Sequence, residues 1–125
     1  MDPNVATDTR SIARAYHRGW TSKQFDEAIR LLAPGLRVEV PINDYPTRES
    51  FAAALAGFGQ LVEHVELLAE FADGEHAMLL YDMDVRGLGR MRVAEHFTVR
   101  AGKIVLLRQV HDTAAVRAAG MGGKA

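Results

Sequence analysis

The chain has 125 residues, 48% hydrophobic and 25% charged, which is ordinary for one globular domain with a sizeable core and excludes general disorder. Fifteen basic and sixteen acidic residues leave a formal charge of −1, so neither a nucleic-acid-binding surface nor a polyacidic one is indicated. The absence of cysteine excludes disulfides, thiol nucleophiles and thiolate metal sites.

The start of the chain and its hydropathy bear on where the protein works. Residues 1–4 contain no basic region followed by an apolar run, as a secretory signal would. No apolar stretch approaches the ~20 residues that cross a bilayer. We therefore expect a cytoplasmic protein that does not contact a membrane.

Helical periodicity dominates the first part of the sequence. Over residues 8–20 the apolar side chains recur at i, i+3 and i+4, with Asp8 or Thr9 as the candidate cap. Residues 21–24 have the spacing of a capping box and are expected to open a second helix. That helix presents apolar side chains over residues 25–32, and the Pro-Gly pair after it is expected to stop it.

The middle of the chain indicates one short strand and a third helix. Residues 36–40 alternate between apolar and charged side chains and precede a proline, which is typical of a strand with one buried face. Residues 42–46 are expected to form a loop. Thr47 then caps a helix that runs to Phe58, with Glu49 favourable in its first turn.

Beyond Gly59 the hydrophobic period changes to two. Four long strands are predicted, at residues 62–71, 76–86, 91–100 and 104–111. Short turns join them, so they should form antiparallel hairpins, and the tail from Ala114 adds a helical turn before the end frays. The predicted class is α+β: a cone-shaped, strongly curved and mostly antiparallel sheet, with three helices from the first half enclosing an apolar pocket. One domain spans residues 1–125, with a core at about 8–113 and frayed ends.

Several short motifs carry a resemblance to a known family. They are Ala15-Tyr16, Phe25-Asp26-Glu27-Ala28, Val38-Glu39-Val40-Pro41 and the segment from Val93 to Ile104. The pattern, over about residues 8–112, resembles the nuclear transport factor 2-like superfamily in its SnoaL-like branch, which includes ketosteroid isomerases, polyketide cyclases, limonene epoxide hydrolases and scytalone dehydratases. The resemblance implies a pocket for a small hydrophobic molecule, no cofactor, and a homodimer formed through the outer face of the sheet. It is specific for the fold and weak for the reaction, because this scaffold hosts many chemistries.

Glu95 is the most informative candidate, because it lies in the middle of the apolar face of its strand. A carboxyl group there loses water, which raises its pKa unless a donor compensates. It resembles the aspartic acid that ketosteroid isomerases keep protonated to bind a substrate oxyanion. Tyr16 resembles their oxyanion tyrosine, and Glu95 is the natural partner for its hydroxyl. The alternatives are a rim carboxylate paired with an arginine or Lys103, and a core tyrosine bonded to a backbone carbonyl.

The departures from the family patterns limit the chemistry. The position of the isomerase general base is Val40, and Glu39 beside it faces the other way, so steroid isomerisation is not expected. Epoxide hydrolysis is not expected either, because the hydrolase positions for aspartate, tyrosine and asparagine resemble Gln109, Val38 and Val40. His111 is the candidate replacement base, with a rim histidine as the alternative. Asp82 and Asp84 fall on the outer face by periodicity, whereas family comparison allows the inner face.

The remaining candidates are expected to form the walls of the pocket. Trp20 is either a wall or ordinary core, and the expected substrate-binding set is completed by Val38, Val40, Phe58, Val93, Phe97, Leu107 and Gln109. His17, His64 and His96 are expected on outward or peripheral faces. No histidine pair has the i, i+4 spacing of a zinc site, and no acidic cluster indicates calcium, so no metal is expected.

Three functions remain open at this point. The first is a cofactor-independent isomerase, cyclase or dehydratase acting on a hydrophobic carbonyl or hydroxyl compound, with Glu95 and Tyr16 stabilising negative charge on oxygen. The second is a non-catalytic pocket that binds an apolar ligand. The third is an interaction module in which outward Leu68, His96 and Thr98, with Leu79 or Leu80, pair two copies or bind a partner.

Overall fold

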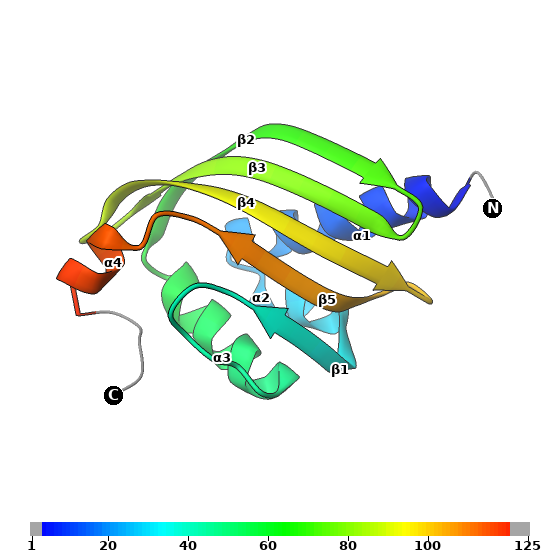
Figure 1. The fold of residues 1–125 in the computed structure, drawn as a ribbon, viewed down its shortest axis with the longest axis horizontal. Helices are drawn as coiled ribbons and strands as arrows, with labels where there is room; N and C mark the ends of the chain where they lie inside the picture. The colour runs from blue at the N-terminus through cyan, green and yellow to red at the C-terminus, as the bar shows by residue number, and fades with distance from the viewer. Residues whose placement is uncertain (1–3, 121–125) are drawn as a thin grey trace.

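Helix α1 (Asn4–Thr21) lies against the concave side of a curved sheet in the computed structural model, which describes residues 4–120 (Figure 1). It buries an apolar stripe that includes Ala13 and Tyr16. The expected caps are wrong, because the helix begins before Asp8 and Thr9. The Thr9 hydroxyl instead donates to the backbone carbonyl of Gly74, 2.8 Å away, and so ties the helix to a turn of the sheet.

Helix α2 (Phe25–Arg30) is shorter than predicted and has no capping box. The hydroxyls of Thr21 and Ser22 donate to carbonyls of the last turn of α1, at 2.8 and 2.6 Å, instead of to the start of α2. Gln24 occupies the N-cap position without a side-chain hydrogen bond. A serine or threonine hydroxyl can accept from a free N–H at the start of a helix or donate to a free carbonyl at its end. Here both hydroxyls donate to carbonyls at the end of α1.

Strand β1 (Leu32–Glu39) starts where the second helix was expected to continue. It is an edge strand that pairs in parallel with β5 (Lys103–Val110), and its register shifts between Leu32 and Arg37. Pro34 falls in that irregular stretch, where the missing backbone N–H costs no ladder hydrogen bond. The prediction that a helix reaches Leu32 is therefore wrong. Helix α2 ends at Arg30, and Pro34 interrupts the pairing of β1 instead of terminating the helix.

The other strands form the predicted antiparallel meander. They are β2 (Val62–Asp73), β3 (His76–Val85), β4 (Gly89–Arg100) and β5, and the sheet order is β1-β5-β4-β3-β2. Helix α3 (Arg48–Gly59) has Thr47 as its N-cap, as predicted, and the side-chain oxygen of Thr47 accepts from Ser50 N at 3.0 Å. Helix α4 (Ala114–Ala118) follows β5. The expected fraying concerns mainly residues 1–3 and 121–125, which lie outside the described residues.

The arrangement confirms the α+β class, with helices α1, α2 and α3 on the concave side of the sheet (Figure 1). The sheet curves over them but does not close into a barrel. Its concave face carries every second residue of β3 and β4, and these side chains form the core with α1. None of the helices between residues 4 and 120 combines the length and hydropathy needed to cross a bilayer.

Candidate functional site

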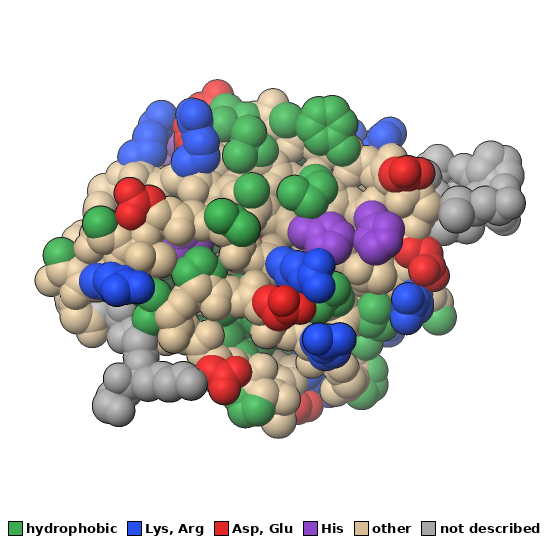
Figure 2. Space-filling view, in the orientation of Figure 1, with side chains coloured by type: hydrophobic (Ala, Val, Ile, Leu, Met, Phe, Trp, Pro, Cys, Tyr) green, Lys and Arg blue, Asp and Glu red, His purple; other side chains and the backbone are tan. Residues whose placement is uncertain are grey.

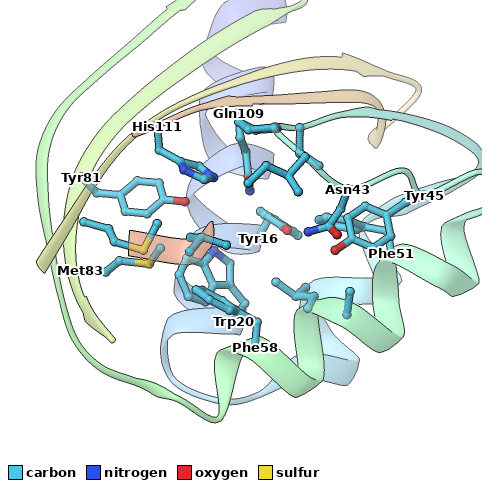
Figure 3. A pocket seen from close by; sticks show the side chains of 17 residues that line it. Tyr16, Trp20, Asn43, Tyr45, Phe51, Phe58, Tyr81, Met83, Gln109 and His111 are labelled. Carbon is cyan, nitrogen blue, oxygen red and sulfur yellow. The ribbon is translucent and has the colours of Figure 1, made fainter. Parts of the chain in front are cut away.

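A cavity of about 290 Å³ lies between the concave face of the sheet, α1 and α3 (Figure 3). Its polar groups come from Tyr16 on α1, Tyr81 on β3, and Gln109 and His111 at the end of β5. Asn43 and Tyr45, from the loop before α3, lie on the side of the cavity away from Tyr81 and His111 (Figure 3). The apolar walls include Trp20, Val40, Phe51, Leu55, Phe58, Met83, Met91 and Val116.

Glu95 lies directly behind the cavity wall and has no exposed surface. Its Oε1 accepts a hydrogen bond from the Tyr81 hydroxyl at 3.1 Å, and its Oε2 accepts one from Gln109 Nε2 at 2.8 Å. Burial raises the pKa of this carboxyl group to about 7, although the two hydrogen bonds pull it down. Glu95 therefore reaches the cavity only through Tyr81 and Gln109, and no arginine or lysine among residues 4–120 pairs with it.

Tyr16 has a fully buried side chain whose hydroxyl has no hydrogen-bond partner within residues 4–120. Its ring packs edge-on against Phe97, with 5.6 Å between the ring centroids. Burial, followed by the nearby Glu95 carboxylate, raises the pKa of the phenol well above its usual value, so it stays protonated. The expected hydrogen bond between Tyr16 and Glu95 does not form, because Tyr81 occupies that oxygen. Tyr16 is thus a donor at the cavity wall, and leaving it unpaired costs about 1–3 kcal/mol.

His111 lies on the cavity wall between Tyr81 and Gln109 (Figure 3). Its Nδ1 is 2.9 Å from the backbone oxygen of Asp112. A carbonyl oxygen only accepts, so Nδ1 carries the proton and Nε2 of the neutral ring keeps a lone pair. The last strand therefore places a candidate proton acceptor on the same cavity wall as the Glu95 network.

Apart from Glu95, Asp82 and Asp84, the predicted site residues divide into two groups. Trp20, Val40, Phe58 and Gln109 line the cavity together with Tyr16 and His111. The four others are packed in the core or against it and do not line the cavity: Val38, Val93, Phe97 and Leu107. Phe97 is covered by Tyr16 from α1, so this part of the concave face is closed to a ligand. The structure does not bring these four residues to the cavity, and their expected contact with a substrate stays a prediction.

Asp82 and Asp84 lie on the outer face of the sheet, where periodicity places them. Asp82 accepts two hydrogen bonds from the Arg92 guanidinium, at 2.7 and 2.9 Å, and Asp84 accepts one from Arg90 at 3.2 Å. The hydrogen bonds from Arg92 hold the pKa of Asp82 below its usual value. Neither carboxylate faces the cavity, so neither is available to it as a base.

His17 is buried, contrary to the expectation that it is peripheral. Only 8% of it is exposed, and its ring packs against Tyr81 and Trp20, with centroid distances of 4.8 and 5.7 Å. Its Nδ1 has no hydrogen-bond partner in the described chain, and burial lowers its pKa to about 4. His17 supports two residues of the cavity wall from behind. Around it and elsewhere in residues 4–120, no three His, Asp or Glu side chains gather as metal ligands would.

Sequence reasoning missed several residues of the cavity wall. Tyr81 and Met83 fall on the apolar side of β3, and that alternation is the signal that would have found them. Ile42, Asn43 and Tyr45 belong to a loop without periodicity, and Ile42 has a backbone φ of 73°, which is rare for a β-branched residue. Within this loop, Tyr45 packs edge-on against Phe51 in the first turn of α3.

Comparisons with known proteins agree with this architecture. A family model described as a SnoaL-like domain matches residues 13–107. A crystal structure of a protein from Kribbella flavida is 31% identical, with 94% of each chain covered and a TM-score of 0.84. An NTF2-like protein of unknown function from Cytophaga hutchinsonii is 15% identical, covering 94% of this chain and 99% of that one, with a TM-score of 0.76. An LEH-like epoxide hydrolase of M. tuberculosis is 19% identical, covering 91% and 90%, with a TM-score of 0.73. No curated protein matches the sequence.

Proposed function

The chain belongs to the SnoaL-like domain family, and on that premise we propose that it binds a small, largely apolar molecule in this cavity and converts it without a cofactor. The observation that carries the proposal is Tyr16, which is among the residues that line the cavity and whose fully buried hydroxyl has no partner within residues 4–120. An unpaired buried hydroxyl destabilises the fold, and a ligand that accepts its hydrogen bond would remove that destabilisation. The complementary ligand group is an oxygen that accepts a hydrogen bond.

The chemistry that this wall supports is proton transfer next to a carbonyl. Tyr16 donates to the carbonyl oxygen and stabilises the negative charge that develops there when a neighbouring proton leaves. His111 Nε2 is the acceptor for that proton, on the same wall. Isomerisation, aldol-type cyclisation and dehydration all use this pair of roles.

Glu95 acts as a positioning residue in this proposal, because it does not line the cavity. It holds the Tyr81 hydroxyl and the Gln109 amide in fixed orientations. The ketosteroid isomerase route remains disfavoured, because Val40 presents an apolar wall where a general base is required. Epoxide hydrolysis is disfavoured for the same reason, and because Gln109 is an amide held by Glu95.

The test combines ligand detection with turnover. Native mass spectrometry and a screen of apolar ketones, enones and hydroxylated aromatics should identify a ligand, and the screen is then followed for product. Tyr16→Phe is expected to lower affinity and turnover at least tenfold while circular dichroism stays unchanged. Tyr45→Phe, the same change at a half-buried tyrosine of the loop before α3, is the matched control and should change both by less than threefold. Equal turnover in wild type and Tyr16→Phe would remove Tyr16 from the mechanism.

A non-catalytic pocket is the alternative within the same cavity. It predicts that a ligand binds in a Tyr16-dependent manner and is recovered unchanged after long incubation. His111→Gln separates the two, because it should abolish turnover while leaving affinity within a few-fold if His111 is the base. Affinity that follows Tyr16 alone, with no product from wild type, would favour the binding function.

A second candidate function concerns the outer face of the sheet, which no helix of residues 4–120 covers (Figure 1). The register aligns four apolar residues across four strands: Ala69, Leu80, Ala94 and Val110. Phe71 and Met78 pair in the adjacent row of the same face, and hydrophobic side chains gather on this face in Figure 2. The register also resolves one expectation, because Leu80 points outward and Leu79 is buried.

We propose that a second copy of the chain covers this row. The neighbouring row pairs Asp82 with Arg92, so the face carries both charges and is matched by its own copy after a two-fold rotation. Wild type should then sediment as a dimer at micromolar concentration, and Leu80→Arg as a monomer, because a charge in the centre of an interface is not compensated. A wild-type monomer would exclude this candidate.

A further inference from the structure

The Gln109 amide has a defined orientation, because of what it bonds to. Above its pKa of about 7 Glu95 is an ionised carboxylate that only accepts hydrogen bonds, so the atom 2.8 Å from its Oε2 is the amide nitrogen. The amide group is planar, and its Oε1 therefore points away from Glu95. No hydrogen bond holds Oε1 within residues 4–120, and Gln109 lines the cavity. The cavity wall thus presents a hydrogen-bond acceptor at this position.

The second oxygen of Glu95 makes that orientation robust. Its partner is the Tyr81 hydroxyl, at 3.1 Å, so both oxygens of the carboxylate are occupied by donors. Turning the Gln109 amide over would place Oε1 against a carboxylate oxygen, with two acceptors facing each other in a buried site. The network therefore fixes the polarity of Gln109 from behind the wall.

Tyr16 and Gln109 consequently offer opposite polarities to one ligand. Tyr16 presents a hydroxyl without a partner, which is a donor, and Gln109 presents a carbonyl oxygen, which is an acceptor. Resting on the function proposed above, we infer that the cavity selects a hydroxy-carbonyl compound, whose carbonyl oxygen accepts from Tyr16 and whose hydroxyl donates to Gln109 Oε1. The volume of about 290 Å³ is at the lower end of the range for ligand pockets, which is about 300–1,000 Å³. Together with the apolar walls, this volume fits a small compound of one or two rings.

The experiment compares matched bicyclic probes. Positional isomers of hydroxytetralone carry both groups, their methyl ethers lack the donor, and the corresponding tetrahydronaphthols lack the carbonyl. Binding is followed at pH 8 through the fluorescence of Trp20, which is the single tryptophan and lines the cavity. At least one hydroxytetralone should bind tenfold or more tighter than both its ether and its tetrahydronaphthol, since a site with a buried unpaired group discriminates strongly.

Two variants test whether Gln109 is responsible for the preference for hydroxyl over ether and Tyr16 for the preference for ketone over tetrahydronaphthol. Glu95→Gln replaces the carboxylate with an amide that both donates and accepts, so both orientations of Gln109 become possible. The preference for hydroxyl over ether should fall below threefold in that variant, while the preference for ketone over tetrahydronaphthol remains. Tyr16→Phe should do the reverse, and so the pair controls for general loss of the fold.

The outcomes separate the inference from the function on which it rests. Ethers that bind wild type as tightly as hydroxytetralones, with Tyr16→Phe weakening both, overturn the hydroxy-carbonyl preference and leave the cavity function standing. A hydroxyl preference that survives in Glu95→Gln overturns the role of the Glu95 network. No binding by any probe, or binding that Tyr16→Phe leaves unchanged, overturns the function and the inference together.

Discussion

Two buried groups, His17 and Glu95, should make the stability of this protein depend on pH in opposite directions. Burial lowers the pKa of His17 from 6.5 to about 4, so between these values the unfolded chain holds a proton that the folded chain lacks. His17 therefore destabilises the fold as the pH falls below 6.5. Burial raises the pKa of Glu95 from 4.5 to about 7, so the folded chain keeps a proton that the unfolded chain has lost. Glu95 therefore destabilises the fold as the pH rises above 4.5.

The magnitudes follow from the two displacements of pKa. Each proton held by one state only changes the free energy of unfolding by about 1.4 kcal/mol per pH unit. Between pH 4.5 and 6.5 the contributions of His17 and Glu95 have opposite slopes and cancel. Glu49, Glu70 and Asp82, whose pKa values are lowered, titrate below this window. The two buried groups thus add no net slope to wild type within it.

Single substitutions should uncover the two slopes. His17→Phe keeps a ring against Tyr81 and Trp20, and relative to wild type its free energy of unfolding should fall by about 1.4 kcal/mol per unit of rising pH. Glu95→Gln should show an equal rise. Urea unfolding at half-unit steps from pH 4.5 to 6.5, followed by Trp20 fluorescence, gives both slopes. The double variant should return to the wild-type slope. A Glu95→Gln slope identical to wild type would refute the claim that the folded state holds Glu95 protonated through this range.

Three further substitutions test local packing and pairing. Tyr16→Phe removes an unpaired buried hydroxyl and should raise the free energy of unfolding of the ligand-free protein by about 1 kcal/mol, measured by urea unfolding; a loss of stability would mean that the hydroxyl has a partner. Gly59→Ala would place a Cβ in steric conflict with the Phe25 ring and should cost about 1–3 kcal/mol, whereas Gly57→Ala meets nothing within 4 Å and should be neutral or stabilising. Thr47→Ala removes the capping box of α3 and should lower the melting temperature through a loss of about 1 kcal/mol.

The sequence was sufficient for the parts of the fold that periodicity governs. Strands β2 to β5 carry a hydrophobic period of about two and are joined by short turns, so their order, their antiparallel pairing and the burial of Glu95 could be predicted from the pattern. The cap at Thr47 could be predicted as well, because it depends on residues three positions apart. The wrong predictions concern segments whose residues are compatible with two different local structures. Thr21 and Ser22 serve the end of α1 instead of the start of α2, and Pro34 lies within an edge strand.

The candidate site was predictable only in part, because its geometry is set by contacts between distant segments. Six of the expected residues line the cavity, but nothing local to Phe97 or Val93 indicates that α1 covers them. The partner of Glu95 depends on the register of β3 and β5 beside β4, and a single sequence does not give that register. His17 falls on the polar side of its helix by pattern, and only the inward curvature of the sheet buries it against Tyr81.

The polar groups in the core argue that this cavity is more than a packing defect. An apolar side chain in place of Glu95 would fill the concave face without the cost of burying a carboxyl group, so stability alone does not account for it. Tyr16 carries a second such cost in its unpaired hydroxyl, and His17 carries a third in its unpaired Nδ1. All three belong to one cluster around Tyr81: Glu95 bonds its hydroxyl, His17 packs on its ring, and Tyr16 lines the same cavity. Unrelated packing defects would be distributed over the whole core. Destabilising buried polar groups that gather at one cavity wall are instead expected of a site that is preorganised for a ligand.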